Sequence, residues 1–393
     1  MSKNSACFRL FCTRFSIQFN FDRGNMSKVI ISDVQNNRIP EIIENIFEIF
    51  GIKEKVKDKI ILVKPNLLGA FPPERGVTTD PRIISAIVQE LKKYKPKEII
   101  VGDNSGSIHF DPLKIAKITG ILDASCGCYS NIAKEIVKVK IDSPFIKELF
   151  ISKIVKQADY IINVPKFKTH GLTTITGALK NMFGIIPGGK KAKLHTFSRS
   201  IKEFAELLID IYQIRIPDLN IMDAIIGMEG PGPTNGKARI INKILSSDNG
   251  VSLDSIMASM MGINPNSIEL LQVAKERDLG ETNISNIIID GELKVIPGFK
   301  IPNSGILNFI RKAAVPYAFS FASVKPIVDH HKCKICKKCI EVCPASAMNL
   351  TNNFPEVDRK KCISCFCCDE HCPYGAIILP SWPQDIFQRL KGK

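Results

Sequence analysis

Eight cysteines near the C-terminus repeat one spacing pattern twice, and this repeat constrains the chain more than any other feature. Each copy reads C-x2-C-x2-C-x3-C-P, and every cysteine of the first copy recurs 29 residues later in the second. The positions are Cys333, Cys336, Cys339 and Cys343, then Cys362, Cys365, Cys368 and Cys372. Thiols at this density, alternating with lysine and aspartate, indicate metal ligation rather than a disulfide scaffold.

The spacing is typical of [4Fe-4S] clusters, because three close thiolates can occupy three corners of a cubane while a short turn carries the fourth away. In two-cluster ferredoxins the fourth thiolate ligates the other cluster. We therefore predict two [4Fe-4S] clusters and a role in electron transport. Cluster one is assigned to Cys333, Cys336, Cys339 and Cys372, and cluster two to Cys362, Cys365, Cys368 and Cys343. The alternative is a pair of zinc sites, which seldom use this spacing followed by proline.

The chain of 393 residues is long enough for a large α/β domain and a small α+β ferredoxin-like two-cluster domain. We expect residues 1–25 to be disordered or a mis-assigned start, because Met26 opens a sequence that resembles a first strand. The remaining boundaries are predicted as an α/β domain at 26–299, a connector at 300–326, the cluster domain at 327–380 and a tail at 381–393.

Between residues 28 and 299, short β-branched runs alternate with stretches of helical period, which predicts a mostly parallel sheet flanked by helices. The expected strands are 59–64, 98–102, 160–164, 220–224, 243–246 and 286–289. The expected helices are 81–93, 145–156, 200–214, 252–261 and 267–277. The first of these helices has the clearest start, because Asp80 can cap it and Pro81 suits its first position.

The formal charge of +15, from 54 basic and 39 acidic residues, favours an acidic or anionic partner. Aromatic residues make up only 7%, which disfavours nucleic acid. No stretch offers the roughly 20 apolar residues of a membrane span, since 306–324 is interrupted by Arg311, Lys312 and Pro316. The first 25 residues lack the apolar core and cleavage site of a signal peptide. We therefore predict a cytoplasmic protein without a membrane span.

Four motifs in the large domain carry a resemblance to a known family. They are VKPNLL (63–68), GDNSG (102–106), NVPKFKTHGLTTITGALKNMFGIIPG (163–188) and MEGPGPTNG (228–236). In matching order, these motifs resemble the family called domain of unknown function 362, in which such a domain is sometimes joined to bacterial-type ferredoxin modules. The resemblance covers residues 28–299 and implies a domain pairing, but no settled reaction.

Polar residues follow the ends of several predicted strands, where an open parallel sheet forms its ligand crevice. These residues are Lys64, Asn66, Asp103, Asn104, Lys166, Asp223 and Asp248. Residues 160–202 contain eight lysines or arginines and no acidic residue, which predicts a phosphate or carboxylate site. The alternative is a solvated basic face. We expect the free amides of a helix opening at Gly177, capped by Thr174 or Thr176, to contribute to this site.

The residues assigned to the anion site are Lys64, Asn66, Asp103, Lys168, Lys180 and Asn181. Catalytic roles are assigned to His170, His195, Lys166 and Asp223, although either histidine could instead be structural. Beyond the first 25 residues, three further cysteines have no assigned role. Cys126 and Cys128 are too close in sequence to bridge each other without strain, and Cys367 lies beside a predicted ligand.

The leading hypothesis is an iron-sulfur oxidoreductase that passes electrons to or from an anionic metabolite held by the α/β domain. Its partner would be a redox protein. A second hypothesis is a non-catalytic electron carrier that docks an acidic redox partner through its basic surface. A third is a non-redox anion-binding enzyme whose clusters only stabilise the fold, and it predicts that a chain ending near Pro297 keeps its activity.

Overall fold

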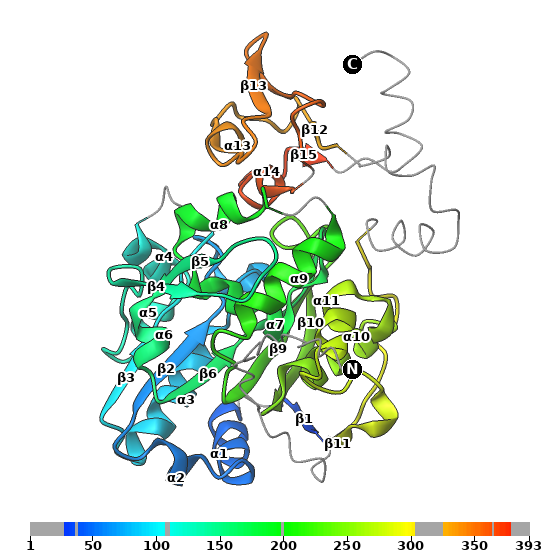
Figure 1. Ribbon diagram of the computed structural model, residues 1–393. Helices are drawn as coiled ribbons and strands as arrows, with labels where there is room; N and C mark the ends of the chain where they lie inside the picture. The colour runs from blue at the N-terminus through cyan, green and yellow to red at the C-terminus, as the bar shows by residue number, and fades with distance from the viewer. Residues whose placement is uncertain are drawn as a thin grey trace, which may run out of the picture.

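The computed structural model describes residues 27–35, 38–106, 111–197, 200–302, 325–363 and 365–378. A large α/β domain carries a small cysteine-rich domain at one end (Figure 1). The predictions for residues 1–25, for most of the connector at 300–326 and for the tail at 381–393 lie outside the described residues.

The large domain is built on one mixed sheet with the order β11-β1-β10-β9-β6-β2-β3, and β7 also pairs with β9. Parallel pairing joins β2 to β3 and β6, β6 and β7 to β9, and β1 to β11, so the predicted α/β class is confirmed. The strands are β1 (Lys28–Asp33), β2 (Ile60–Pro65), β3 (Glu98–Val101), β6 (Tyr160–Val164), β7 (Lys166–His170), β8 (Thr174–Ile175), β9 (Leu219–Glu229), β10 (Lys237–Ser247) and β11 (Ile288–Asp290).

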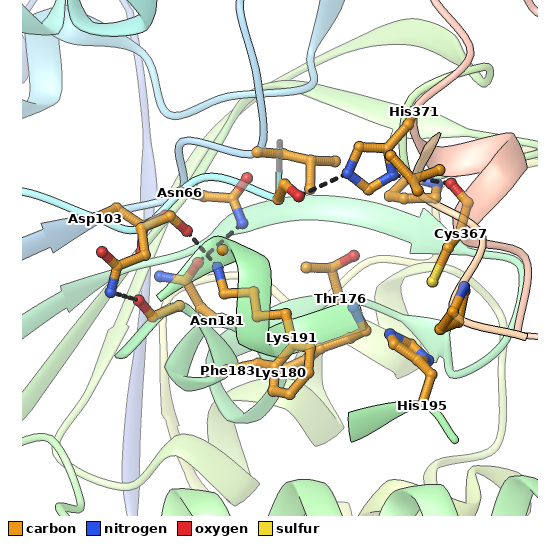
Figure 2. A pocket seen from close by; sticks show the side chains of 18 of the residues that line it. Asn66, Asp103, Thr176, Lys180, Asn181, Phe183, Lys191, His195, Cys367 and His371 are labelled. Atoms are coloured by element: carbon orange, nitrogen blue, oxygen red, sulfur yellow. Dashed lines mark hydrogen bonds between the residues drawn. The ribbon is translucent and has the colours of Figure 1, made fainter. Parts of the chain in front are cut away.

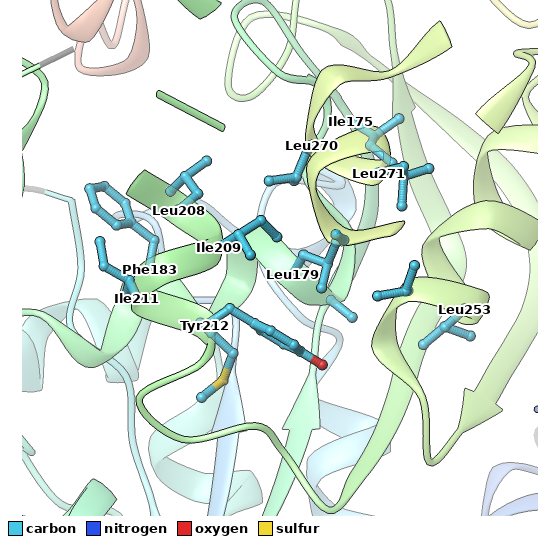
Figure 3. Close-up of a cluster of buried hydrophobic side chains, with 14 of the residues drawn as sticks. Ile175, Leu179, Phe183, Leu208, Ile209, Ile211, Tyr212, Leu253, Leu270 and Leu271 are labelled. Atoms are coloured by element: carbon cyan, nitrogen blue, oxygen red, sulfur yellow. The ribbon is translucent and has the colours of Figure 1, made fainter. Parts of the chain in front are cut away.

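Helices cover both faces of this sheet, and each layer buries its own hydrophobic cluster. The helix α3 begins where the sequence predicts, since the Asp80 carboxylate accepts a hydrogen bond from the Arg82 amide. The helices are α1 (Ile39–Ile49), α2 (Ile52–Val56), α3 (Pro81–Lys93), α4 (Pro112–Ile118), α5 (Ile121–Ala124), α6 (Lys153–Gln157), α7 (Gly177–Asn181), α8 (Gly188–Leu194), α9 (Ile201–Tyr212), α10 (Gly250–Met260) and α11 (Glu269–Glu276). Figure 3 shows the core of the layer that contains α7, α9, α10 and α11, where Leu179, Tyr212, Leu253 and Leu271 belong to one hydrophobic cluster.

The predicted helix at 145–156 is wrong. Strands β4 (Ile136–Lys140) and β5 (Glu148–Ser152) form an antiparallel hairpin there, and only α6 after them is helical. Leu149 and Ile151 are buried while Phe150 between them is half-buried, which is the period of a strand. In a short apolar run this period is hard to tell from a helical one.

The direction of β10 also changes one predicted site. Because β10 runs antiparallel to β9, with Ser247 opposite Asn220, its C-terminal end lies at the amino ends of the parallel strands. Asp248 follows that end, so its predicted place in the ligand crevice is wrong.

The cysteine-rich domain has two short helices of matching position. Helices α13 (Lys338–Glu341) and α14 (Cys367–Glu370) each follow a residue with a positive φ of 60°, Lys337 and Phe366 respectively. Two small antiparallel sheets complete the domain, and α14 is its element nearest the large domain (Figure 1). The strands are β12 (Ile327–Val328), β13 (Met348–Thr351), β14 (Phe354–Val357) and β15 (Ile377–Ile378).

Candidate functional site

The eight repeated cysteines separate into two groups, and each group lines a small cavity of its own. The outer group is defined as Cys333, Cys336, Cys339 and Cys372, and the inner group as Cys343, Cys362, Cys365 and Cys368. Each group therefore combines three close cysteines of one copy with the fourth cysteine of the other copy, which is the interleaving that the sequence predicts.

The pKa shifts of two buried thiols follow the same grouping, because the cysteines that contribute to each shift belong to the same group. Burial, with the nearby groups of Cys372, Cys336 and Cys333, raises the pKa of the Cys339 thiol to about 12. Burial likewise raises the pKa of the Cys368 thiol, with further contributions from Cys365, Asp369, Cys362 and Cys343. Packing four sulfurs together without a metal is thus unfavourable for their charged form. A bound cation that stabilises thiolates would remove that cost.

The backbone around the sulfurs suits cluster ligation. The amides of Ala347 and Ala376 donate hydrogen bonds of 3.2 Å to the sulfurs of Cys343 and Cys372, and the amide of Ile335 donates one of 3.4 Å to Cys333. Such bonds to cluster sulfurs tune the potential of a bound iron-sulfur cluster. Among the described residues, no three His, Cys, Asp or Glu side chains are arranged to share one metal ion. A cubane takes one thiolate at each of its four irons, and each cysteine group supplies four sulfurs, so this donor set fits a cluster.

A third cavity of about 290 Å³ lies between the two domains (Figure 2). We call it the crevice. On the large-domain side it opens at the carboxyl ends of β2 and β3, where an open parallel sheet binds ligands. The large domain contributes Asn66, Leu68, Asp103, Asn104, Gly106, Lys168, Thr176, Lys180, Asn181, Phe183, Gly184, Gly188, Lys191, His195 and Pro233, and the small domain contributes Glu341, Val342, Cys343, Pro344, Cys367 and His371.

Hydrogen bonds between the domains fix the small-domain wall of the crevice. The His371 ring lies with Nε2 at 2.7 Å from the carbonyl oxygen of Gly106 and Nδ1 at 2.8 Å from that of Cys367. Asn235 donates to the carboxylate of Asp369 at 2.7 Å. Figure 2 shows the sulfur of Cys367 directed into the crevice beside His371. Asp369 and His371 thus attach the C-terminal end of α14 to the large domain, while the contact of His371 with Cys367 lies within the small domain.

Of the six residues predicted for the anion site, five line the crevice, namely Asn66, Asp103, Lys168, Lys180 and Asn181. A polar network holds them in place. The Lys168 amino group donates to the Asn66 side-chain oxygen at 3.0 Å, and the Asn66 amide donates to Asn181 at 2.8 Å.

The sixth residue, Lys64, lies behind the crevice wall. Its amino group is fully buried, pairs with Asp103 at 2.8 Å and donates to the Asn181 carbonyl at 2.6 Å. Burial lowers the pKa of Lys64, and the Asp103 carboxylate opposes this effect. The Lys64 charge thus offsets the negative charge of Asp103 at the crevice surface.

The four residues predicted to be catalytic are not brought together. His195 lines the crevice, stacked on Phe204 with ring centroids 4.5 Å apart. His170 lies elsewhere, and its Nδ1 accepts hydrogen bonds from the amides of Leu172 and Thr173. Lys166 and Asp223 form a fully buried ion pair of 2.6 Å outside the crevice. The buried pair therefore stabilises the fold and does not line the crevice.

The predicted anion site at the start of α7 is wrong, because a carboxylate of the chain already occupies it. The amides of Ala178 and Leu179 donate to Asp254 at 2.6 and 3.0 Å. Gly177 has a φ of +56°, and a Cβ there would lie 2.3 Å from the Asp254 carboxylate. Only glycine fits this close approach. The sequence could not reveal it, since Asp254 is far from α7 along the chain.

Asp254 makes stability depend on pH. Complete burial raises its pKa to about 7, against the two amide hydrogen bonds. Between its ordinary pKa and pH 7 the folded chain therefore holds more protons than the unfolded chain, so the free energy of unfolding falls as pH rises. From pH 5 to pH 8 we expect a loss of about 2 to 3 kcal/mol. Denaturant titrations would measure it, and Asp254→Asn should lack that dependence; an equal pH slope in both proteins would contradict the assignment.

Two buried polar residues add to the binding groups of the crevice. Asn104 was among the strand-end residues predicted for the crevice, whereas Thr176 was predicted only as a cap of α7. The side-chain oxygens of Asn104 and Thr176 have no hydrogen-bond partner within the described part of the chain, and each residue is only 4% exposed. Lys191, which donates to the carbonyl oxygens of Asn104 and Ser105, adds a cation at the same wall. A ligand with both acceptor and donor groups could satisfy these positions.

The fold and the cysteine cavities define an iron-sulfur protein in which a small cluster domain is attached to a large α/β domain. The chain belongs to the family described as Domain of unknown function (DUF362), which matches residues 61–259, as the sequence motifs predicted. Residues 325–373 match a 4Fe-4S dicluster domain, which supports iron-sulfur cluster binding and electron transfer. No helix in the described ranges is long and apolar enough to cross a membrane.

Two comparisons with individual proteins add context. Over 234 residues the chain is 29% identical to the "Thylakoid-associated protein sll1697" of Synechocystis sp., an alignment that covers 56% of this chain and 69% of that protein. The lactate racemase apoprotein from Thermoanaerobacterium thermosaccharolyticum is similar with a TM-score of 0.39 and 12% identity, over 60% of this chain and 57% of the racemase chain. The chain thus spans less than two thirds of the racemase, and no activity is carried over from it.

Proposed function

We propose that this protein is an oxidoreductase that binds two [4Fe-4S] clusters and exchanges electrons with an anionic small molecule in the crevice. One observation carries the proposal: Cys343 lines both the inner cysteine cavity and the crevice. A ligand of the proposed inner cluster is thereby also a wall of the proposed substrate site. Cys367 and Pro344 belong to both cavities as well.

In this proposal the outer group of cysteines holds one cluster and the inner group holds the other. A [4Fe-4S] cluster exchanges one electron at a time, so a two-electron change of the substrate needs two exchanges and an outside electron carrier to balance them. The chain's own contribution is to hold the substrate against Cys343 and to shield it from water between the domains.

Charge at the crevice favours an anion. Lys168, Lys180 and Lys191 line it, while the carboxylate of Asp103 is already paired with Lys64. The only other carboxylate among the described lining residues belongs to Glu341. In this proposal His195 gives or takes a proton, which its position among the lining residues of the crevice supports.

The lining of the crevice also helps to judge the alternative hypothesis of a non-redox enzyme whose clusters only stabilise the fold. That hypothesis predicts a ligand site that survives removal of the cluster domain. Six crevice residues belong to the cluster domain, including Cys343 and His371, so truncation near Pro297 would open the site to solvent. This arrangement favours the redox hypothesis.

The test uses anaerobically reconstituted protein, reduced with dithionite and desalted. A panel of phosphorylated and carboxylated small molecules is first screened by thermal shift, and each binder is then mixed with the reduced protein. We expect at least one binder to reoxidise the clusters, which visible absorption would report. If every crevice binder left the clusters reduced, the proposal would be contradicted.

Lys180 and Lys190 allow a matched comparison, because only Lys180 lines the crevice. Lys180→Ala should raise the half-saturating concentration of the binder about 10-fold or more, because it removes a crevice cation. Lys190→Ala removes the same charge nearby, but Lys190 packs over the Phe150 ring at 3.3 Å and is not a crevice residue. It should bind as the unmodified protein does. Equal effects of the two variants would contradict the proposed site.

A further inference from the structure

The two cysteine groups differ in what surrounds them. The inner cavity shares Cys343, Pro344 and Cys367 with the crevice, whereas the outer cavity shares no lining residue with it. In the outer group, moreover, Cys336 is exposed to solvent. An iron-sulfur cluster in the outer group would thus be the one within reach of another protein.

Basic and apolar side chains surround this exposed cysteine. Lys334, Lys337 and Lys338 line the outer cavity, together with Tyr374. Tyr374 is 48% exposed, and Ile335, which lies between Lys334 and Cys336, is 39% exposed. Exposed apolar side chains beside charged ones suit a specific but transient protein interface. We call these residues the lysine face, comprising Lys334, Ile335, Cys336, Lys337, Lys338 and Tyr374.

We infer that the lysine face docks an acidic one-electron carrier protein. Opposite charges steer such partners together and orient them, so the carrier would approach with its redox centre toward Cys336. In each encounter one electron would leave the reduced carrier and enter the cluster that the outer cysteines would hold, and no bond would be made or broken. The inference rests on the proposed two-cluster assignment and names the partner that balances the reaction in the crevice.

A protein fits this face better than an extended polyanion does. The exposed tyrosine and isoleucine provide an apolar patch that a carrier can bury, which a phosphate backbone or a lipid headgroup layer would not use. The lysines also lie at one end of the molecule, since the cysteine-rich domain sits at the end opposite α2 (Figure 1). Charges more than about 10 Å apart are screened in physiological salt, so the local lysines decide the association.

The test compares two double charge reversals that change the net charge equally. Lys334→Glu with Lys337→Glu alters the lysine face, and Lys53→Glu with Lys55→Glu alters exposed residues of α2 at the far end. An acidic flavodoxin serves as the probe. Calorimetry at low salt measures its association in the oxidised state, and stopped-flow absorption measures anaerobic reduction of the protein by the flavodoxin semiquinone or hydroquinone.

We expect the lysine-face variant to bind the flavodoxin at least 10-fold more weakly, to be reduced at least 10-fold more slowly, and to lose most of the salt dependence. The α2 variant should match the unmodified protein within about twofold. Reduction by a zwitterionic viologen should be equal in all three proteins. Lys334→Gln with Lys337→Gln should give a smaller loss of the same kind.

Unchanged flavodoxin association in the lysine-face variant would overturn the inference, and so would an equal loss in the α2 variant. Loss of binding to anionic lipid vesicles, with flavodoxin association unchanged, would also overturn it and assign the face to a membrane surface. Failure of the underlying proposal looks different, because unmodified protein would then contain no iron and give no cluster EPR signal after anaerobic reconstitution.

Discussion

Replacing Cys343 with alanine should abolish electron exchange with the crevice ligand, lowering the rate by at least about 100-fold, and should lower the iron content. The reason is that Cys343 is the proposed fourth ligand of the inner cluster and is also a crevice wall residue. Loss of a single corner ligand is expected to leave a three-iron cluster, which EPR of the oxidised protein distinguishes from a four-iron cluster. Iron analysis and single-turnover reoxidation by a crevice binder are the measurements.

The repeat provides a matched control for this variant. Cys372 occupies the equivalent position in the second copy, and its sulfur accepts an amide hydrogen bond of the same 3.2 Å length, from Ala376. It lines the outer cavity and not the crevice. Cys372→Ala should therefore lose as much iron while keeping the reoxidation of the remaining cluster by the crevice binder. Similar loss of reoxidation in both variants would argue against contact between the inner group and the substrate.

Replacing Lys166 with methionine should destabilise the protein by about 3 to 5 kcal/mol. Lys166 and Asp223 are fully buried, and their ion pair of 2.6 Å has no exposed atoms to recover solvation if one partner is lost. The Asp223 carboxylate would keep the hydrogen bonds that it accepts from the amides of Asp80 and Ile225 but would lose its buried counter-charge. Denaturant unfolding of both proteins in the same cluster state would measure the difference.

A surface pair supplies the comparison for this second variant. Lys153 and Glu135 form an ion pair of 2.8 Å, but both side chains are largely exposed. Lys153→Met should cost no more than about 1 kcal/mol. A Lys166→Met variant that unfolds within about 1 kcal/mol of the unmodified protein would contradict the structural role assigned to the buried pair.

Local sequence signals predicted the elements whose causes lie within a few residues. The cap of α3 is an example, since Asp80, Pro81 and the apolar period all belong to one segment. The hairpin of β4 and β5 was missed, because an apolar run of three residues does not decide between strand and helix. Strand β7 was missed because its polar sequence does not resemble that of a buried strand. Its sequence KFKTH looks exposed, yet every residue in it is buried, because Lys166 and Lys168 find polar partners on other strands and loops.

The candidate site likewise contains residues that local sequence signals predicted and residues that they did not. Strand-end polarity led to Asn66 and Asp103, because parallel strands end at a common edge whatever the details of packing. Lys168, Lys180 and Asn181 belong to the basic stretch 160–202, whose charge pattern predicted an anion site. The small-domain wall was not predictable, since Cys343 and His371 reach the crevice only through the way the two domains pack. His371 contacts Gly106 across 265 positions of sequence. No local pattern marks a contact of that kind.

The central claim is that the crevice and the inner cysteine group form one redox unit, and an EPR-monitored potential titration tests it most directly. The reconstituted protein is titrated with and without a saturating crevice binder. We expect the potential of one cluster to fall, because a nearby negative charge stabilises the oxidised form, while the potential of the other cluster stays constant. A binder that leaves both potentials unchanged, or that shifts the two equally, would contradict the claim.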